Sequence, residues 1–80
     1  MKRITIRVMR RADGPGWVVA VGGLRIGRRS QYLAAVEARS LALQHALTGG
    51  LAEVVIHRRD GTIGQRDTYP RSSDPRRSRG

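Results

Sequence analysis

Apolar and polar side chains alternate at the N-terminal end of the chain. Residues 4–9 carry a β-branched apolar residue at every second position, and this period of two predicts a half-buried β-strand. A turn containing Gly and Pro at 12–16 leads to residues 17–21, which are apolar on both faces and predict a central strand. The glycines at 22–23 can turn the chain again. Residues 24–26 then predict either a short third strand or an extended crossing into the next element.

A helical pattern follows from about residue 33 to residue 47. Glu37, Ser40 and Gln44 form a polar stripe at spacings of three and four, which predicts an α-helix. Gly49-Gly50 favours a stop, because Gly adopts the left-handed cap conformation at low cost. The side opposite the polar stripe carries small residues that let a helix backbone lie close to a sheet, namely Ala35, Ala38, Ala42 and Ala46.

A second hairpin completes the pattern. Residues 52–59 predict a strand, and residues 62–68 predict its antiparallel partner. Between them, Asp60-Gly61 favours a type I′ turn, in which both central residues have positive φ. The order strand, strand, short strand, helix, strand, strand predicts an α+β fold with a mainly antiparallel sheet and the helix on one face. We expect residues 1–69 to form one compact domain and residues 70–80, which include no large aliphatic or aromatic side chain, to be a disordered Arg-rich tail.

Positive charge is concentrated toward the two ends of the sequence. The net charge is +10, from 16 basic and 6 acidic residues, and every basic residue except Lys2 is Arg. Residues 1–30 hold eight of the cations against Asp13, whereas residues 31–69 hold four cations and four acids. The tail at 70–80 adds four arginines and one acid. Such charge either keeps a small protein in solution or is neutralised by an anionic partner.

The arginine-rich segments favour a phosphate-containing partner. A guanidinium bridges two phosphate oxygens, and the release of counterions adds affinity that falls steeply with salt. We therefore expect a nucleic-acid-binding domain that is largely sequence-nonspecific and uses the N-terminal hairpin and the tail. Duplex is favoured over single strand, because aromatic residues for base stacking are scarce. The candidate binding residues are Arg3, Arg7, Arg10, Arg11, Arg25, Arg28, Arg29, Arg76 and Arg77.

A protein partner is the alternative. In this hypothesis the domain is a protein-interaction or inhibitor module, of phage or mobile-element type, that docks an acidic protein surface. The apolar arc of the helix is wider than one sheet contact requires. Val36, Leu43 and Leu47 are therefore candidates for a homodimer interface.

The chain offers little for catalysis or metal binding. It has no Cys, and His45 and His57 are its only imidazoles, without clustered carboxylates. The glycines of residues 22–27 match neither a dinucleotide fingerprint nor a P-loop. We expect no enzyme activity, cofactor, metal or small-molecule substrate. Trp17 is expected in the core rather than stacked on a base. Residues 1–6 resemble neither a signal peptide nor a membrane span, so a cytoplasmic location is expected.

Several segments together carry a family resemblance over roughly residues 4–69. They are Gly16-Trp17-Val18-Val19, the helix residues Ala38 and Ala42, the segment Ala52-Glu53-Val54-Val55-Ile56-His57-Arg58-Arg59-Asp60-Gly61-Thr62-Ile63, and Asp67-Thr68-Tyr69. With these segments the chain resembles the small bacterial and archaeal family called domain of unknown function 2188.

The resemblance implies a strand–strand–helix–strand–strand domain and no established activity. The sequence departs from the family pattern at the start of the helix. Where the family usually carries a capping Thr, this chain has Ala34. Ser30 is the alternative cap, and it would lengthen the helix by one turn.

Overall fold

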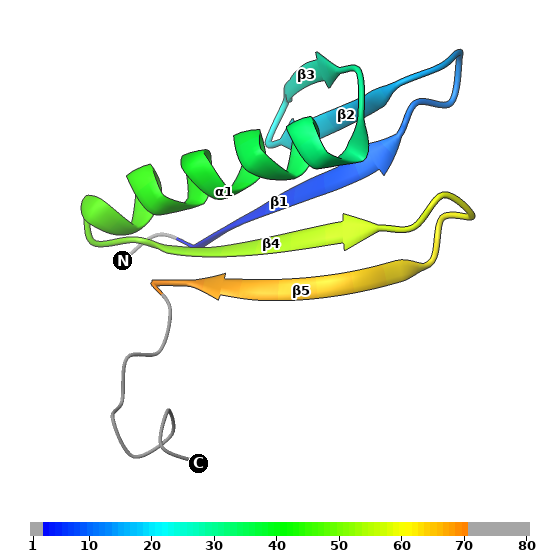
Figure 1. Cartoon of the computed structure of the whole chain (residues 1–80). Helices are drawn as coiled ribbons and strands as arrows, with labels where there is room; N and C mark the ends of the chain where they lie inside the picture. Colours follow the sequence, from blue (N-terminus) through cyan, green and yellow to red (C-terminus); the bar gives the residue numbers. More distant parts are fainter. Residues whose placement is uncertain (1–2, 71–80) are drawn as a thin grey trace.

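A mixed β-sheet of five strands carries one α-helix on one of its faces (Figure 1). The computed structural model of the chain describes residues 3–70. The α+β class, the single helix and the short third strand agree with the sequence prediction. Most of the tail expected to be disordered, with Arg76 and Arg77, lies outside the described residues. In chain order the elements are β1 (Arg3–Arg10), β2 (Trp17–Val21), β3 (Leu24–Arg28), α1 (Gln31–Leu47), β4 (Leu51–His57) and β5 (Ile63–Tyr69).

The two hairpins meet through a parallel pair of strands. The strand order is β3-β2-β1-β4-β5, and β1 pairs with β4 in parallel, whereas the other pairs are antiparallel. The sheet is therefore mixed, with a parallel pair within a mainly antiparallel arrangement. Because β1 and β4 run in the same direction, the loops that follow them lie at the same end of the sheet (Figure 1). These loops are residues 11–16 and residues 58–62, and we call this end the loop end.

The core lies between α1 and the sheet face that it covers. Ile6 and Val8 of β1 are fully buried, and so are Ala34 and Ala38 of the helix. The small alanine side chains let the helix backbone lie close to the strands, as the sequence predicts. Burial of each large aliphatic side chain stabilises the fold by about 1.5–3 kcal/mol. Trp17 is only 8% exposed and belongs to this cluster, which confirms its expected position in the core.

No helix or strand within residues 3–70 covers the opposite face of the sheet (Figure 1). Successive side chains of a strand point to opposite faces, so Arg3, Thr5 and Arg7 project here. Val55 also lies on this open face by register, yet it is 1% exposed. Its cross-strand neighbours are Arg7 and Arg66, and the aliphatic stems of such residues cover apolar surface while their charged groups stay in water.

The helix begins at the alternative cap. The Ser30 side chain accepts a hydrogen bond of 3.2 Å from the backbone N–H of Leu33, and the helix starts at Gln31 rather than near residue 33. At the other end, Gly49 has a φ of 91°, a conformation that Gly adopts readily. The predicted glycine stop is therefore confirmed.

The turn between β4 and β5 differs from the expected type. A type I′ turn needs positive φ at both central residues, but Gly61 alone has it, with φ of 94°, and Asp60 does not. The backbone N–H of Gly61 donates to the carbonyl of Arg58, and that of Arg58 donates to the carbonyl of Thr62. The Asp60 carboxylate instead accepts from the Thr62 N–H and hydroxyl, at 3.0 and 2.7 Å. These bonds stabilise a longer loop in which only the glycine is left-handed.

Candidate anion-binding groove

A groove of about 660 Å³ lies between the two loops at the loop end. Arg10 and Arg11 line it from the first hairpin, and Arg58 and Arg59 line it from the second. Asp60 is the only carboxylate among the lining residues. We call this feature the loop groove. Its four guanidinium groups come from segments almost fifty positions apart, and the parallel pairing of β1 with β4 brings them together.

Arg58 and Arg59 are not among the binding residues predicted from the sequence. Residues 31–69 hold equal numbers of cations and acids, so the net charge of this segment gives no sign of them. In space three of the four acids, Glu37, Glu53 and Asp67, lie away from the loop groove, and only Asp60 lines it. Glu53 faces Arg66 at 3.7 Å, and Asp67 accepts a hydrogen bond from Gln65. A segment that is neutral in sequence therefore presents two cations against one carboxylate at the loop end, and only the non-local strand pairing brings them beside Arg10 and Arg11.

The loop groove adjoins two further hollows that are also lined by arginine. A hollow of about 710 Å³ on the open face shares Arg10 and Arg11 with the groove and adds Arg25. A hollow of about 600 Å³ beside the helix start is lined by Arg11, Arg28 and Arg29. Five of the candidate residues named from the sequence thus gather around the end of the first hairpin.

The remaining candidates on β1 do not line the groove. Arg3 is seven residues from Arg10, or about 23 Å along an extended strand, at the opposite end of the sheet. Arg7 lies between them on the open face, where its Nη1 donates to Nε2 of His57 at 3.2 Å. Arg76 and Arg77 lie outside residues 3–70.

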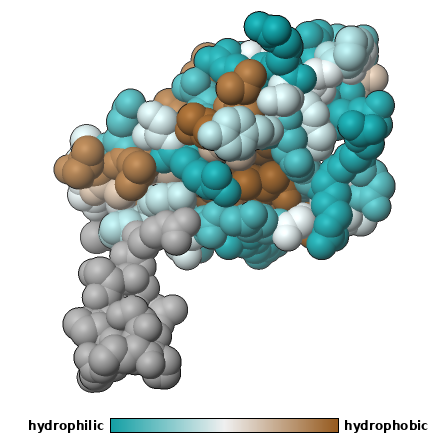
Figure 2. Space-filling model, in the orientation of Figure 1, coloured by the Kyte–Doolittle hydropathy of each residue, from teal (hydrophilic) through white to brown (hydrophobic). Residues whose placement is uncertain are grey.

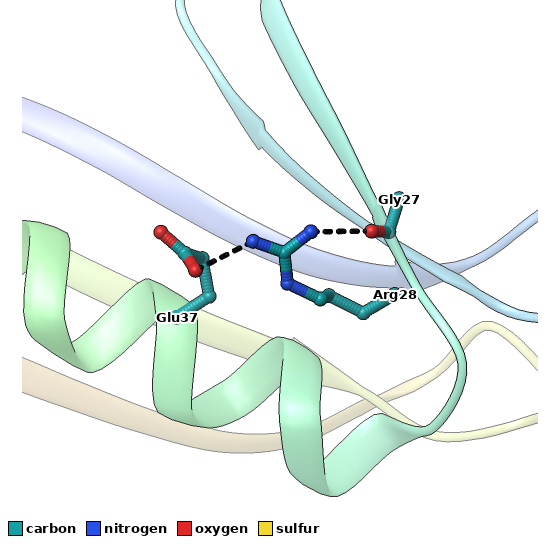
Figure 3. Close-up of polar contacts among 3 residues, drawn as sticks. All are labelled: Gly27, Arg28 and Glu37. Atoms are coloured by element: carbon teal, nitrogen blue, oxygen red, sulfur yellow. Dashed lines mark hydrogen bonds and ion pairs between the residues drawn. The ribbon is translucent and has the colours of Figure 1, made fainter.

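Two of the gathered arginines already have carboxylate partners. Arg28 Nη2 donates to Glu37 Oε1 at 2.8 Å, and its Nη1 donates to the carbonyl of Gly27 (Figure 3). Arg11 pairs with Asp13 at 3.2 Å, but both side chains are exposed, and such pairs contribute little free energy. The Arg11 guanidinium holds the pKa of the Asp13 carboxyl below its usual range. Within residues 3–70, Arg10, Arg25, Arg29, Arg58 and Arg59 have no carboxylate at ion-pair distance.

Hydrogen bonds hold Arg58 in place at the groove. Its Nη1 donates to the Thr62 hydroxyl at 3.3 Å and to the Ile63 carbonyl at 3.1 Å. Its stem lies against Gly64, where an added Cβ would meet the Arg58 Cγ at 3.0 Å. A guanidinium has five N–H donors, so the remaining donors of this oriented group are available to a ligand.

His57 connects the groove to the rest of the sheet. The predicted strand continues to residue 59, but His57 is the last residue of β4 and lies opposite Ile63. Its Nδ1 lies 2.9 Å from the carbonyl of Gly61, and its Nε2 receives the Arg7 donor. Since a carbonyl only accepts and a guanidinium only donates, these contacts place the His57 proton on Nδ1. The residue thereby ties the second loop to β1.

Other chemistries find less support in the described part of the chain. Among residues 3–70, no group of three or more His, Cys, Asp or Glu is placed to hold a metal ion. No α-helix in that range has the length and apolar character needed to cross a membrane.

Comparison with known proteins agrees with the resemblance read from the sequence. The sequence profile of one family, described as "Uncharacterized protein conserved in bacteria (DUF2188)", matches residues 6–69. This match covers both hairpins and the helix between them. No match was found among curated proteins or among solved structures. Since the match spans most of the chain, the chain belongs to this family of bacterial proteins, DUF2188.

Proposed function

We propose that the protein binds nucleic acid through its phosphate backbone, with the loop groove as the centre of the contact. The observation that carries this proposal is the gathering of Arg10, Arg11, Arg58 and Arg59 around one groove, with Asp60 as the single carboxylate. Cations held close together repel one another, and a polyanion relieves that repulsion.

The chemistry of the groove favours phosphate. Each guanidinium can bridge two phosphate oxygens, and Arg58 is already oriented by Thr62 and Ile63. The adjoining hollow at Arg25 extends the cationic surface across the first hairpin. Contacts of this kind position a nucleic acid without reading its bases. We therefore propose binding that is largely independent of sequence.

The positions of the aromatic residues favour duplex over single strand. Single-strand binding usually depends on bases that stack on exposed aromatic rings. Trp17 and Tyr69 are buried, and Tyr32 lies on the helix outside the loop groove. Since neither Trp nor Tyr is among the described residues that line the groove, backbone contacts to a duplex are the better fit.

A salt titration tests the proposal. Fluorescence anisotropy with a labelled duplex of about 20 base pairs should show binding at low salt that weakens as salt rises. The slope of log K against log salt is about −0.9 per neutralised phosphate, so four contacts give a slope between about −3 and −4. Replacing Arg10 and Arg58 together by Ala should reduce the magnitude of the slope by about two.

Arg3→Ala provides the matched control, because it removes the same charge at the far end of β1. It should change the affinity much less than Arg10→Ala. Equal losses from the two variants would show that net charge, not the groove, carries the binding. Absence of duplex binding at about 50 mM salt, together with binding to an acidic polypeptide such as polyglutamate, would overturn the proposal in favour of a protein partner.

A further inference from the structure

The outward face of α1 carries large apolar side chains along its length, beside the exposed polar residues Ser40 and Gln44. Large side chains point away from the sheet there, whereas the buried face consists of alanines. Leu47 is 86% exposed and Tyr32 is 72% exposed. In Figure 2 apolar atoms reach the surface over the helix, most clearly at its C-terminal end. A helix on the surface of a monomer normally exposes mostly polar side chains, so the exposure of these large apolar side chains is unusual.

Five of the exposed positions of α1 follow the spacing of a helix–helix seam. Their intervals are three, four, three and four positions, so their side chains form a stripe along one side of the helix. Stripes with this spacing are typical of two helices that pack together at a shallow crossing angle. The stripe extends for about 21 Å at 1.5 Å per residue. We call it the outward stripe; its members are Leu33, Val36, Ser40, Leu43 and Leu47. Val36, Leu43 and Leu47 were named as interface candidates from the sequence, and all three are exposed.

The charged residues of the helix are turned away from this stripe. Glu37 faces Arg28 of β3, and Arg39 lines a hollow with Gln65 of β5. The outward stripe is therefore a charge-free region on a chain whose net charge is +10. Two copies of such a chain can meet at this surface without bringing cations into contact.

We propose that α1 packs against α1 of a second copy, antiparallel, with Ser40 at the two-fold axis. Ser40 is the midpoint of the outward stripe, and its small side chain permits close approach. The symmetry then places Leu33 beside Leu47 of the other copy. The antiparallel direction follows from charge, because the loop groove lies at the N-terminal end of α1, where Gln31 donates to the carbonyl of His57. A parallel pair would place two arginine clusters side by side, whereas the antiparallel pair separates them and aligns the helix dipoles favourably.

The exposed area fits a modest, concentration-dependent dimer. Counting an aromatic side chain at about 200 Å² and an aliphatic one at somewhat less, the stripe and Tyr32 expose on the order of 500 Å² per copy. A stable interface buries about 800 Å² per partner. We expect the polar residues around the outward stripe, including Gln44, to contribute the remaining buried area. This association does not depend on nucleic acid, so either proposal can fail without the other.

Cysteine crosslinking tests the geometry directly, because the chain contains no Cys. Under mild oxidation the full chain carrying Ser40→Cys should form a disulfide-linked dimer that disappears with reductant. Leu47→Cys should not, because the antiparallel arrangement holds the two Leu47 positions at opposite ends. Crosslinking at Leu47→Cys without crosslinking at Ser40→Cys would overturn the antiparallel arrangement.

Sedimentation tests the association itself. The unmodified chain should shift from monomer to dimer as its concentration rises. Leu43→Glu should raise the dissociation constant at least tenfold, with an unchanged circular dichroism spectrum. Leu24→Glu is the matched control, since Leu24 is exposed on β3 outside the outward stripe, and it should leave the association unchanged. A monomer at every concentration, or equal effects of the two variants, would overturn the proposal.

Discussion

Arg28 and Glu37 form an ion pair of 2.8 Å that joins the last residue of β3 to the second turn of α1 (Figure 3). Both side chains are largely shielded, with exposures of 38% and 30%. Arg28 also donates to the carbonyl of Gly27 at 2.7 Å. Among the arginines at the loop end, Arg28 therefore has the clearest structural role and is the least available to bind a ligand.

Replacing Glu37 by Gln should have two opposite effects. Loss of the charge-assisted hydrogen bond should lower the free energy of unfolding by about 1 kcal/mol. The variant also leaves Arg28 without its carboxylate, so duplex affinity at low salt should rise. Urea denaturation and anisotropy measure the two effects. Glu53→Gln is the control, because Glu53 pairs with Arg66 away from the groove. An unchanged unfolding free energy in Glu37→Gln would contradict the structural role of the pair.

Gly50 should not tolerate a side chain. A Cβ at this position would overlap the imidazole ring of His45, and Gly50 is buried. We expect Gly50→Ala to lower the free energy of unfolding by about 1–3 kcal/mol. Gly23→Ala is the control, because beyond its two chain neighbours no residue comes within 4 Å of its added Cβ. In a His45→Ala background the Gly50→Ala substitution should cost much less, and an equal cost in both backgrounds would exclude the overlap as its cause.

The cap of α1 should contribute measurable stability. Ser30→Ala removes the acceptor for the Leu33 N–H, and such substitutions cost about 1 kcal/mol. Ser40→Ala changes the same residue type on the exposed surface of the helix. It should leave stability within a few tenths of a kcal/mol or raise it, because Ala favours helices. Thermal unfolding at low protein concentration distinguishes the two variants, and equal melting temperatures would show that the cap is unimportant.

The β4–β5 turn should weaken in acid. Hydrogen bonds from Thr62 hold the pKa of the Asp60 carboxyl below its usual value of 3.8. A carboxyl whose pKa is lower in the folded state stabilises the fold above its unfolded-state pKa. That contribution is lost as the pH falls through the folded-state pKa. NMR titration of the Asp60 side chain should give a midpoint below 3.8, and Thr62→Ala should move the midpoint upward. A midpoint at or above 3.8 in the unsubstituted chain would contradict the assigned hydrogen bonds.

Local patterns in the sequence predicted most of the elements of the fold. The alternation along β1 correctly placed Ile6 in the core and Arg7 on the open face. Ser30 and Gly49 marked the ends of the helix. These features depend on residues within a few positions of one another. The turn at Asp60 shows the limit of such reasoning, since the dipeptide located the turn and the Thr62 hydrogen bonds decided its type.

The loop groove depends on long-range pairing and could be predicted only in part. Arg10 and Arg11 were identified from local charge, but Arg58 and Arg59 were not. Their proximity follows from the parallel pairing of β1 with β4, which joins residues almost fifty positions apart. The number of charges in a segment does not reveal which charges become neighbours in the fold. Here the parallel direction of the β1–β4 pair determines which arginines lie together.

The parallel pairing of β1 with β4 also separates the loops, where the sequence can vary, from the buried residues, where substitutions would disturb the packing. Both hairpin loops extend past the end of the sheet, whereas the buried side chains belong to the strands, to α1 and to the residues that end them. Insertions, or substitutions that spare Gly16 and Gly61 with their positive φ, in residues 11–16 and 58–62 would therefore reshape one pole of the protein and leave the packing between helix and sheet intact. Such changes would alter the lining of the loop groove without altering the scaffold that carries it.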